Sequence, residues 1–226
     1  GLVFEHDLDR LLAPRMASPV TLTIRRAAEA DSASDSVAAA PTRQVKLPPT
    51  KLRLTGLVME PGPVVLVTTH DGKRSNVMAI SWTMVLDFTP VFAITTGDWN
   101  YSFAALRKNR ECVIAIPAVD MLDQVVGIGT CSGIDTDKFA KFGLTPERGK
   151  IVKAPLIKEC LANIECKVVD IVKKHNIIVL EGVAAYANTA RKEKRTIHAV
   201  GDGTFIVDGP KLDRKKMMAS KLPTGI

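Results

Sequence analysis

Three segments of the sequence gather side chains that can hold a polar ligand without reacting with it. They are residues 75–83 (SNVMAISWT), residues 98–102 (DWNYS) and residues 129–139 (GTCSGIDTDKF). Together they supply amide and hydroxyl groups, one lysine and several small residues. These groups donate and accept hydrogen bonds, but no segment combines a nucleophile with a neighbouring histidine base. The chemistry that they indicate is therefore non-covalent binding.

Each segment taken alone also has an ordinary structural explanation. Asn76 can close a hairpin through a bond from its side chain to the backbone, and Met78 and Trp82 are residue types common in protein cores. Residues 132–133 can form the loop before a helix, and Lys138 can lie on a solvated helix face. Only the three segments together, in this order, favour a binding site.

Motifs for several other chemistries are missing from the sequence. It has no G-x-G-x-x-G after an expected strand, no P-loop and no G-x-S-x-G turn. The four histidines (His6, His70, His175 and His198) are isolated, and the four cysteines (Cys112, Cys131, Cys160 and Cys166) lack the spacing of a zinc site. We therefore expect reduced, buried cysteines, no metal and no catalytic side chain.

The composition is that of an ordinary globular protein. Hydrophobic residues make up 46% of the 226 residues and charged residues 24%, and no stretch reaches the ~20 apolar residues of a membrane helix. Residues 1–16 lack the apolar core of a secretory signal, so we expect a cytoplasmic protein. The net charge is +7, but aromatic residues are only 5%, and we do not expect a nucleic-acid or membrane partner.

The chain divides into three expected regions. Residues 1–53 form an N-terminal extension and linker, which includes the low-complexity stretch AAEADSASDSVAAA at 27–40. Residues 54–210 form the compact domain, and residues 211–226 form a basic tail. The basic runs 191–195 and 214–216 are expected to be solvated, with a mild attraction for nucleotide phosphates as the alternative.

The compact domain is expected to be mainly β. Strands are predicted at 64–69, 75–82, 91–96, 112–116, 161–172, 177–186 and 204–207, with an Asp-Gly hairpin at 70–73. Short helices are predicted at 101–108, 121–126 and 136–142, capped by Asn100, Asp120 and Asp135, the last ending at Gly143. Hairpins and short helices connect the strands, which favours an antiparallel Greek-key barrel with peripheral helices.

In this order, the three segments resemble the flavin-reductase-like family, particularly its flavoredoxin-type branch. The matching pieces are the Asn-to-Ser-Trp strand at 76–82, the Tyr-Ser helix start at 101–102 and the Ser-Gly-x-Asp-x-Asp-Lys-Phe run at 132–139. Residues 154–156 and 164–166 also match, and the resemblance covers roughly residues 57–209. It implies a split β-barrel that binds FMN non-covalently, in a homodimer whose second subunit completes the pocket.

The resemblance also assigns the residues that line the flavin. They are Asn76, Val77, Met78, Ala79, Ser81, Trp82, Thr83, Asn100, Tyr101, Ser102, Ser132, Gly133 and Lys138. An extended strand offers backbone N–H and C=O groups to the polar edge of the isoalloxazine ring. The phosphate would lie at the N-terminus of the helix that begins at Tyr101, where N–H groups are unpaired. Hydroxyls of Ser102 and Thr83 would add donors, and Lys138 a point charge.

The activity implied by the resemblance is an NAD(P)H-dependent FMN reductase, which transfers hydride from nicotinamide to flavin. The alternatives are a flavoredoxin-like electron carrier with a redox-protein partner, and a flavin-binding or nucleic-acid-binding module without turnover. The reductase branch often has a histidine five residues before a Gly-x-Val strand end. Here the candidate is His175, and Gly182 lies two residues too far along the chain, so no catalytic histidine is carried over.

Overall fold

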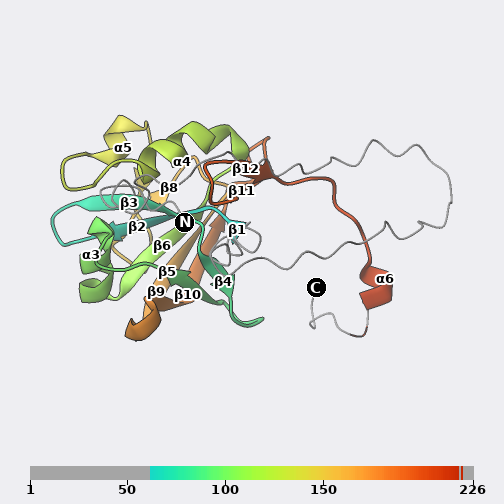
Figure 1. The fold of residues 1–226 in the computed structure, drawn as a ribbon, viewed down its shortest axis with the longest axis horizontal. Coiled ribbons are helices and arrows are strands. Elements are labelled where there is room, and N and C mark those ends of the chain that lie inside the picture. The colour runs from blue at the N-terminus through green and yellow to red at the C-terminus, as the bar shows by residue number, and fades with distance from the viewer. Residues whose placement is uncertain (1–61, 219, 221–226) are drawn as a thin grey trace, which may run out of the picture. The chain divides into compact units, whose positions relative to one another are not determined.

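The computed structural model describes residues 62–218 and residue 220 (Figure 1). The expected extension at 1–53 and the first residues of the expected domain lie outside the described residues. The main element is a seven-stranded antiparallel sheet with strand order β3-β2-β6-β9-β10-β5-β4. Its strands are β2 (Val65–His70), β3 (Ser75–Ile80), β4 (Thr83–Val85), β5 (Val91–Thr95), β6 (Glu111–Ile116), β9 (Ala162–Val172) and β10 (Ile177–Ala187).

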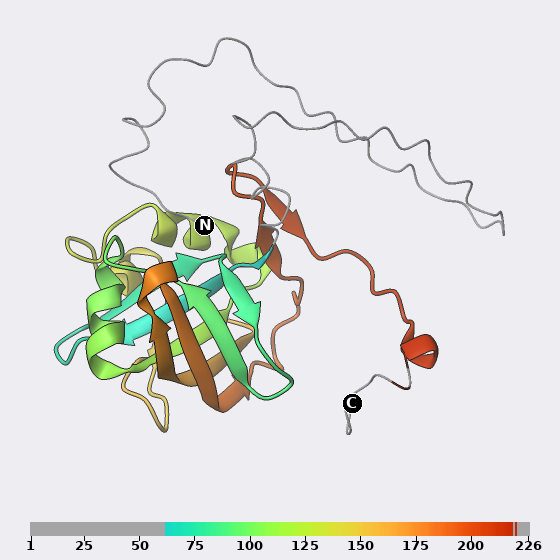
Figure 2. The same cartoon turned by 60° about the horizontal axis from the view of Figure 1, so that its bottom comes forward.

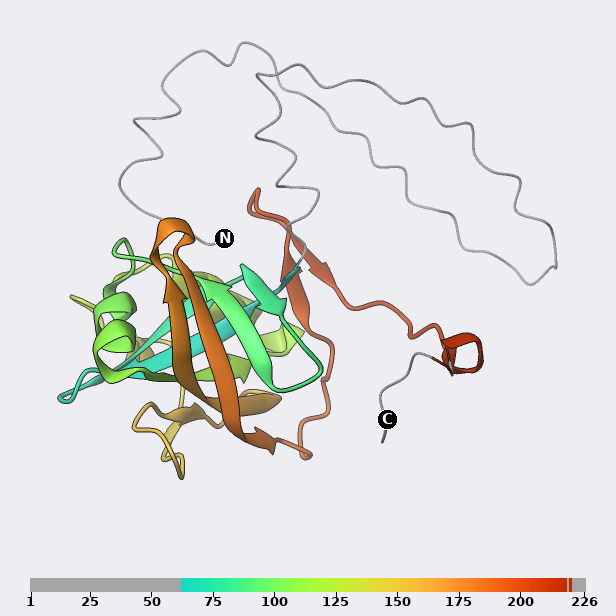
Figure 3. The same cartoon turned by 90° about the horizontal axis from the view of Figure 1, so that it is seen from below.

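The sheet curls because its two edge strands are consecutive in the chain. β3 and β4 occupy opposite edges of the sheet, yet only Ser81 and Trp82 separate them. The Thr83 N–H donates to the Ser81 carbonyl at 3.0 Å and tightens this link. Figures 2 and 3 show the strands wrapped around one another as a half-open barrel. The prediction of a mainly β split barrel with peripheral helices is confirmed.

Apart from α6, the labelled helices lie at the ends and on one flank of the barrel (Figure 1). They are α3 (Tyr101–Asn109), η2 (Val119–Met121), α4 (Leu122–Gly129), α5 (Lys138–Lys141), η3 (Lys173–His175) and α6 (Lys215–Met218). None of the described helices is long and apolar enough to cross a membrane.

β2 is apolar on both faces because both faces are covered. Val65 and Val67 belong to the cluster inside the barrel, whereas Val64 and Leu66 belong to a second cluster that includes residues of α4 and α5. The run VVLVTT at 64–69 is therefore buried on both sides, as its sequence predicts. The same two layers hold β3 in place, which fixes the backbone that carries Asn76.

Two smaller sheets complete the described fold. β1 (Gly62–Pro63), β11 (Ile197–Ala199) and β12 (Phe205–Val207) form a three-stranded sheet, and β7 (Pro146–Glu147) pairs with β8 (Leu156–Ile157). All five strands are two or three residues long, and only β12 was predicted, at 204–207, because such short strands carry no periodicity of their own.

Two helix starts differ from their predictions. The predicted helix at 136–142 is the single turn α5, and its N-cap is Asp137, whose Oδ1 accepts from the Ala140 N–H at 3.1 Å, rather than Asp135. Asp120 lies inside η2 and pairs with Arg191, so it does not cap a helix that begins at 121. Gly143 has φ +63 and follows α5 in the left-handed conformation, as predicted for a helix end.

Candidate functional site

The three segments singled out in the sequence meet at the side chain of Asn76. This amide is 7% exposed on β3, and its Nδ2 donates to the Ser102 hydroxyl in the first turn of α3 at 2.8 Å. Gly133, in the loop before α5, packs against the same amide: a Cβ built on it would stand 2.4 Å from Asn76 Oδ1. One buried side chain therefore joins β3, the start of α3 and the 130–137 loop.

Arg74 makes a second connection between the same parts of the chain. Its Nε donates to the Tyr101 hydroxyl at 3.0 Å, and its Nη1 and Nη2 donate to the Ile134 carbonyl at 3.4 and 3.3 Å. The guanidinium also lies over the Tyr101 ring, 4.9 Å from its centroid, and the hydrogen bond with Tyr101 raises the pKa of Arg74. Arg74 was not predicted. The sequence feature that could have identified it is a cation two residues before Asn76, because this spacing places both side chains on one face of a strand.

A small pocket lies between the β2–β3 hairpin and the start of α3. It has a volume of about 90 Å³, and its lining includes Arg74, Asn76, Tyr101 and Ser102. One water takes roughly 30 Å³ in the liquid, so the pocket has the size of a small polyatomic group such as a phosphate. Asp71 also borders it, with a pKa held low by hydrogen bonds from the Arg74 and Lys73 N–H groups. This carboxylate is therefore ionised, and Arg74 offsets its charge.

No side chain caps the first turn of α3, in which the Phe103 N–H donates to the Asn100 carbonyl at 2.9 Å. Asn100 is at the N-cap position as predicted, but its side chain makes no hydrogen bond to the helix. Its Nδ2 donates instead to the Thr96 hydroxyl at 3.0 Å. The helix has nine residues and no acidic side chain in its first turn. Its N-terminal dipole therefore favours an anion beside Ser102 and Tyr101.

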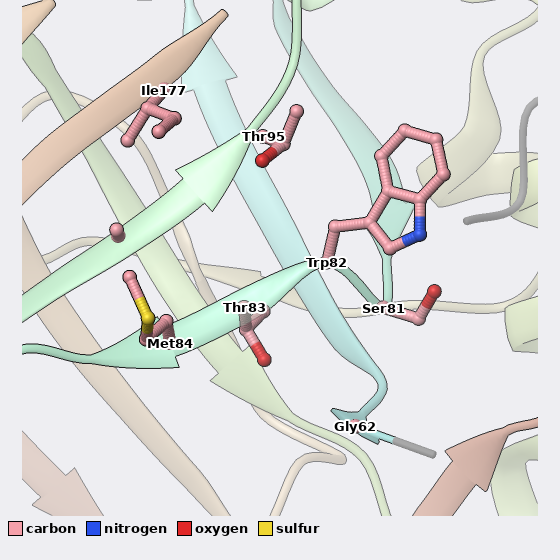
Figure 4. A pocket seen from close by; sticks show the side chains of 8 residues that line it. Gly62, Ser81, Trp82, Thr83, Met84, Thr95 and Ile177 are labelled. Atoms are coloured by element: carbon pink, nitrogen blue, oxygen red, sulfur yellow. The ribbon is translucent and has the colours of Figure 1, made fainter. Parts of the chain in front are cut away.

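A second, larger pocket lies where β3 passes into β4 (Figure 4). Its volume is about 260 Å³, and it is lined by Gly62, Ser81, Trp82, Thr83, Met84, Ala93, Thr95 and Ile177. Figure 4 shows the Trp82 indole projecting away from Met84, while the hydroxyl of Thr83 points toward Gly62. The segment 81–83 was predicted to line a site. The residues from β5 and β10 were not, since only the curling of the sheet brings them there.

β3 offers a ligand its backbone rather than its apolar side chains. Val77 and Ala79 are buried in one core cluster and Met78 in the other, so the core explanation is correct for the Met78 side chain. Among the described strands, however, β3 is hydrogen-bonded only to β2. Its other edge pairs with no described strand, and residues 76–81 are 0–7% exposed. This edge runs from the pocket at Asn76 toward the pocket at Ser81.

Lys138 is buried, not solvated. Only 5% of it is exposed, and its Nζ donates to the Ile128 carbonyl in the last turn of α4 at 2.8 Å. Burial lowers the pKa of this lysine. The ammonium group thus compensates the carbonyl end of α4, and a role for Lys138 in holding a phosphate stays a prediction. Ser132 is exposed and accepts from the Ile134 N–H at 3.1 Å, and His175 is exposed in η3.

Comparison with known proteins identifies relatives of the whole described barrel. The family model described as "Flavin reductase like domain" matches residues 58–203. The uncharacterized protein YddH of Escherichia coli is 29% identical over 181 residues, which are 73% of this chain and 96% of YddH. Among solved structures, flavoredoxin of Desulfovibrio vulgaris is 25% identical, with a TM-score of 0.63 over 68% of this chain and 90% of that one. An FMN-binding domain of a flavin reductases-like enzyme from Shewanella baltica is 23% identical, with a TM-score of 0.63 over 67% and 88%.

Proposed function

Because the chain belongs to the flavin reductase like domain family, we propose that it binds FMN non-covalently and transfers hydride from NAD(P)H to the flavin. The observation that carries this proposal is the convergence of Arg74, Asn76 and Ser102 at a pocket of about 90 Å³. This pocket combines a guanidinium, a hydroxyl and a helix N-terminus, which are the groups that bind a phosphate dianion.

In the proposed site, the FMN phosphate lies in the pocket at Arg74 and Ser102. The isoalloxazine ring then extends along the open edge of β3 toward the pocket of Ser81, Trp82 and Thr83. Ser81 lies five positions after Asn76, which is about 17 Å of extended chain at about 3.3 Å per residue. Backbone groups of β3 would hydrogen-bond the polar edge of the ring, and Trp82 would cover one apolar face.

Bound FMN would supply the capacity to accept hydride, and the protein would bind and orient it. Arg74 would hold the phosphate and so fix the position of the ring. The 40% exposed side chain of Trp82 would exclude water from one side while leaving access for a nicotinamide. No acid or base of this chain is required for the transfer itself. The proposed domain spans residues 54–210, followed by a basic tail.

The second candidate function is electron transfer by a flavoredoxin-like carrier that does not use NAD(P)H directly. The similarity to flavoredoxin favours it. The two functions differ in one experiment. FMN-loaded protein mixed with NADH or NADPH without oxygen loses its oxidised-flavin absorbance at enzymatic rates if it is a reductase. Retained absorbance with both nucleotides would favour the carrier, and failure to bind FMN would contradict both functions.

We further propose that a second copy of the chain covers the apolar surface formed by β4 and the loop between β4 and β5. Met84 and Val85, in the edge strand β4, are 55 and 70% exposed, and Phe88, in the loop that follows, is 84% exposed. Apolar residues gathered at a sheet edge are typical of a surface buried in an assembly. Since Met84 also lines the larger pocket, the second copy would complete the flavin site. Analytical ultracentrifugation tests this: the wild type should sediment as a dimer and Phe88→Asp as a monomer, whereas a monomeric wild type would contradict it.

A further inference from the structure

A third pocket lies on the other side of α3, between this helix and the β9–β10 turn. It is lined by Asp98, Phe103, Arg107, Arg110, Asp170, Ile171, Lys173 and Asn176, and we call it the basic groove. Its volume is about 480 Å³, and it shares no lining residue with the two pockets of the candidate flavin site. Figures 2 and 3 both show α3 beside the turn that contains η3. Cavities of roughly 300–1,000 Å³ hold small ligands.

Three cations converge on the basic groove from separate elements. Arg107 comes from α3, Arg110 from the residue after α3, and Lys173 from η3. Arg107 is paired only loosely with Asp98, at 3.8 Å, and their side chains are 59 and 85% exposed. An exposed pair of this kind is worth little, so the guanidinium can be taken over by a stronger anion. A phosphate is such an anion, because it accepts two parallel hydrogen bonds from one arginine.

The frame of the basic groove is fixed by the sheet. Arg110 adopts φ +55 and ψ 36, its N–H donates to the Leu106 carbonyl at 3.0 Å, and its Nη2 donates to the Val169 carbonyl at 3.2 Å. Asn176 also has a positive φ, +54, and its carbonyl accepts from the Thr96 N–H at 3.0 Å. Left-handed backbone at residues other than glycine is uncommon and persists where the surroundings impose it. The backbone of the arginine and of the asparagine is therefore held in a fixed conformation.

The remaining lining suits the other parts of a nucleotide. Phe103 and Ile171 give the groove an apolar side, and the Arg107 guanidinium lies over the Phe103 ring, 5.6 Å from its centroid. The carboxylates of Asp98 and Asp170 and the amide of Asn176 can accept from sugar hydroxyls or from an amino group of the base. A site for an inorganic anion alone would need neither the apolar side nor the acceptors.

We propose that the basic groove is a second ligand site, which binds a phosphate-bearing nucleotide. Arg107, Arg110 and Lys173 contact the phosphate, and Phe103, Ile171 and the polar acceptors contact the base and sugar. The site is separate from the proposed flavin pocket, so its occupancy does not depend on FMN.

The test is calorimetric titration of the purified full-length protein at low salt with 2′,5′-ADP, 5′-AMP, adenosine and pyrophosphate. The nucleotides should bind about tenfold or more tightly than adenosine, the ratio expected for one charge-assisted contact. Arg107→Ala and Lys173→Ala should each weaken nucleotide binding about fivefold or more. The matched controls are Lys108→Ala and Lys174→Ala, which remove exposed neighbouring lysines outside the groove.

Three results would overturn the proposal. The first is the absence of nucleotide binding. The second is an equal loss of affinity in the control variants, which would indicate diffuse charge attraction. The third is pyrophosphate binding as tight as that of the nucleotides, which would show that the base makes no contribution. FMN affinity is measured in parallel by flavin fluorescence. The FMN affinity should be unchanged in Arg107→Ala. The FMN titration therefore tests the proposed flavin site, and the nucleotide titration tests the basic groove separately.

Discussion

The side-chain amide of Asn76 donates a 2.8 Å hydrogen bond to the hydroxyl of Ser102. Both residues are almost fully buried, and they belong to a strand and a helix separated by 26 positions in the chain. The bond fixes the start of α3 against the open edge of β3. The position of the proposed phosphate site relative to the proposed ring site therefore depends on this contact, together with the bond from Arg74 to the Tyr101 hydroxyl.

Asn76→Ala is expected to lower the free energy of unfolding by about 1–3 kcal/mol, because it leaves a buried hydroxyl without its partner. Ser102→Ala should have a similar effect. The double variant should lose less than the sum of the two, since both changes remove one bond. Urea denaturation of the three variants measures the coupling. Strictly additive losses would show that the two side chains do not stabilise each other.

Gly133→Ala is expected to disturb the same contact from the opposite side. The added Cβ would stand 2.4 Å from Asn76 Oδ1, so the loop or the amide must move. We expect a loss of about 1–3 kcal/mol in the free energy of unfolding, together with weaker FMN binding. Gly209→Ala is the matched control, because nothing lies within 4 Å of a Cβ at that position. Equal stability of the two variants would mean that Gly133 is not packed against Asn76.

Lys138→Ala tests whether this buried lysine holds the FMN phosphate in addition to its hydrogen bond to the Ile128 carbonyl. If the ammonium also reaches the phosphate, FMN affinity should fall by about 1.5–3 kcal/mol, the range for a hydrogen bond to a charged group. Flavin fluorescence titration measures this loss, and thermal unfolding measures the lost contact with the Ile128 carbonyl. Reduced stability with unchanged FMN affinity would contradict the binding role and assign Lys138 to the end of α4 alone.

Glu165 predicts a dependence of stability on pH. It is buried, and its carboxylate accepts from the N–H groups of Lys150, Ile151 and Val152 at 2.9, 2.7 and 2.6 Å and from the Tyr186 hydroxyl at 2.5 Å. Burial alone would raise the pKa of Glu165, but these hydrogen bonds outweigh it and hold the pKa below its usual value.

A carboxyl whose pKa is lowered by folding stabilises the fold above its unfolded pKa, and this contribution is lost as the pH falls through the folded pKa. We therefore expect the wild type to lose stability as the pH falls below about 4.3, the usual value for glutamate. Glu165→Gln should be less stable near pH 7, and its stability should change less over the acid range. Urea denaturation between pH 7 and pH 3 checks this. Parallel pH profiles of the two proteins would contradict the assignment.

The sequence predicts what depends on local pattern. The strand at 64–69, the hairpin at 70–73 and the helix that begins at Tyr101 follow from β-branched runs, Asp-Gly and a capping residue. It does not separate Asp135 from Asp137 as the cap of α5, since both precede the same short helix. Nor does it indicate that Arg74 bonds to Tyr101, because that contact exists only when β3 and α3 are packed together. Lys138 shows most clearly where prediction from the sequence ends. Its burial depends on packing against α4, which its sequence neighbours do not indicate.

The most direct test of the account is the FMN affinity of the wild type and of two neighbouring variants, Arg74→Ala and Lys73→Ala. Arg74 lines the proposed phosphate pocket and Lys73 does not. Fluorescence titration should show binding by the wild type, a loss of about tenfold or more for Arg74→Ala, as for one charge-assisted contact, and little change for Lys73→Ala. No FMN binding by the wild type, or the same affinity for both variants, would contradict the proposed flavin site.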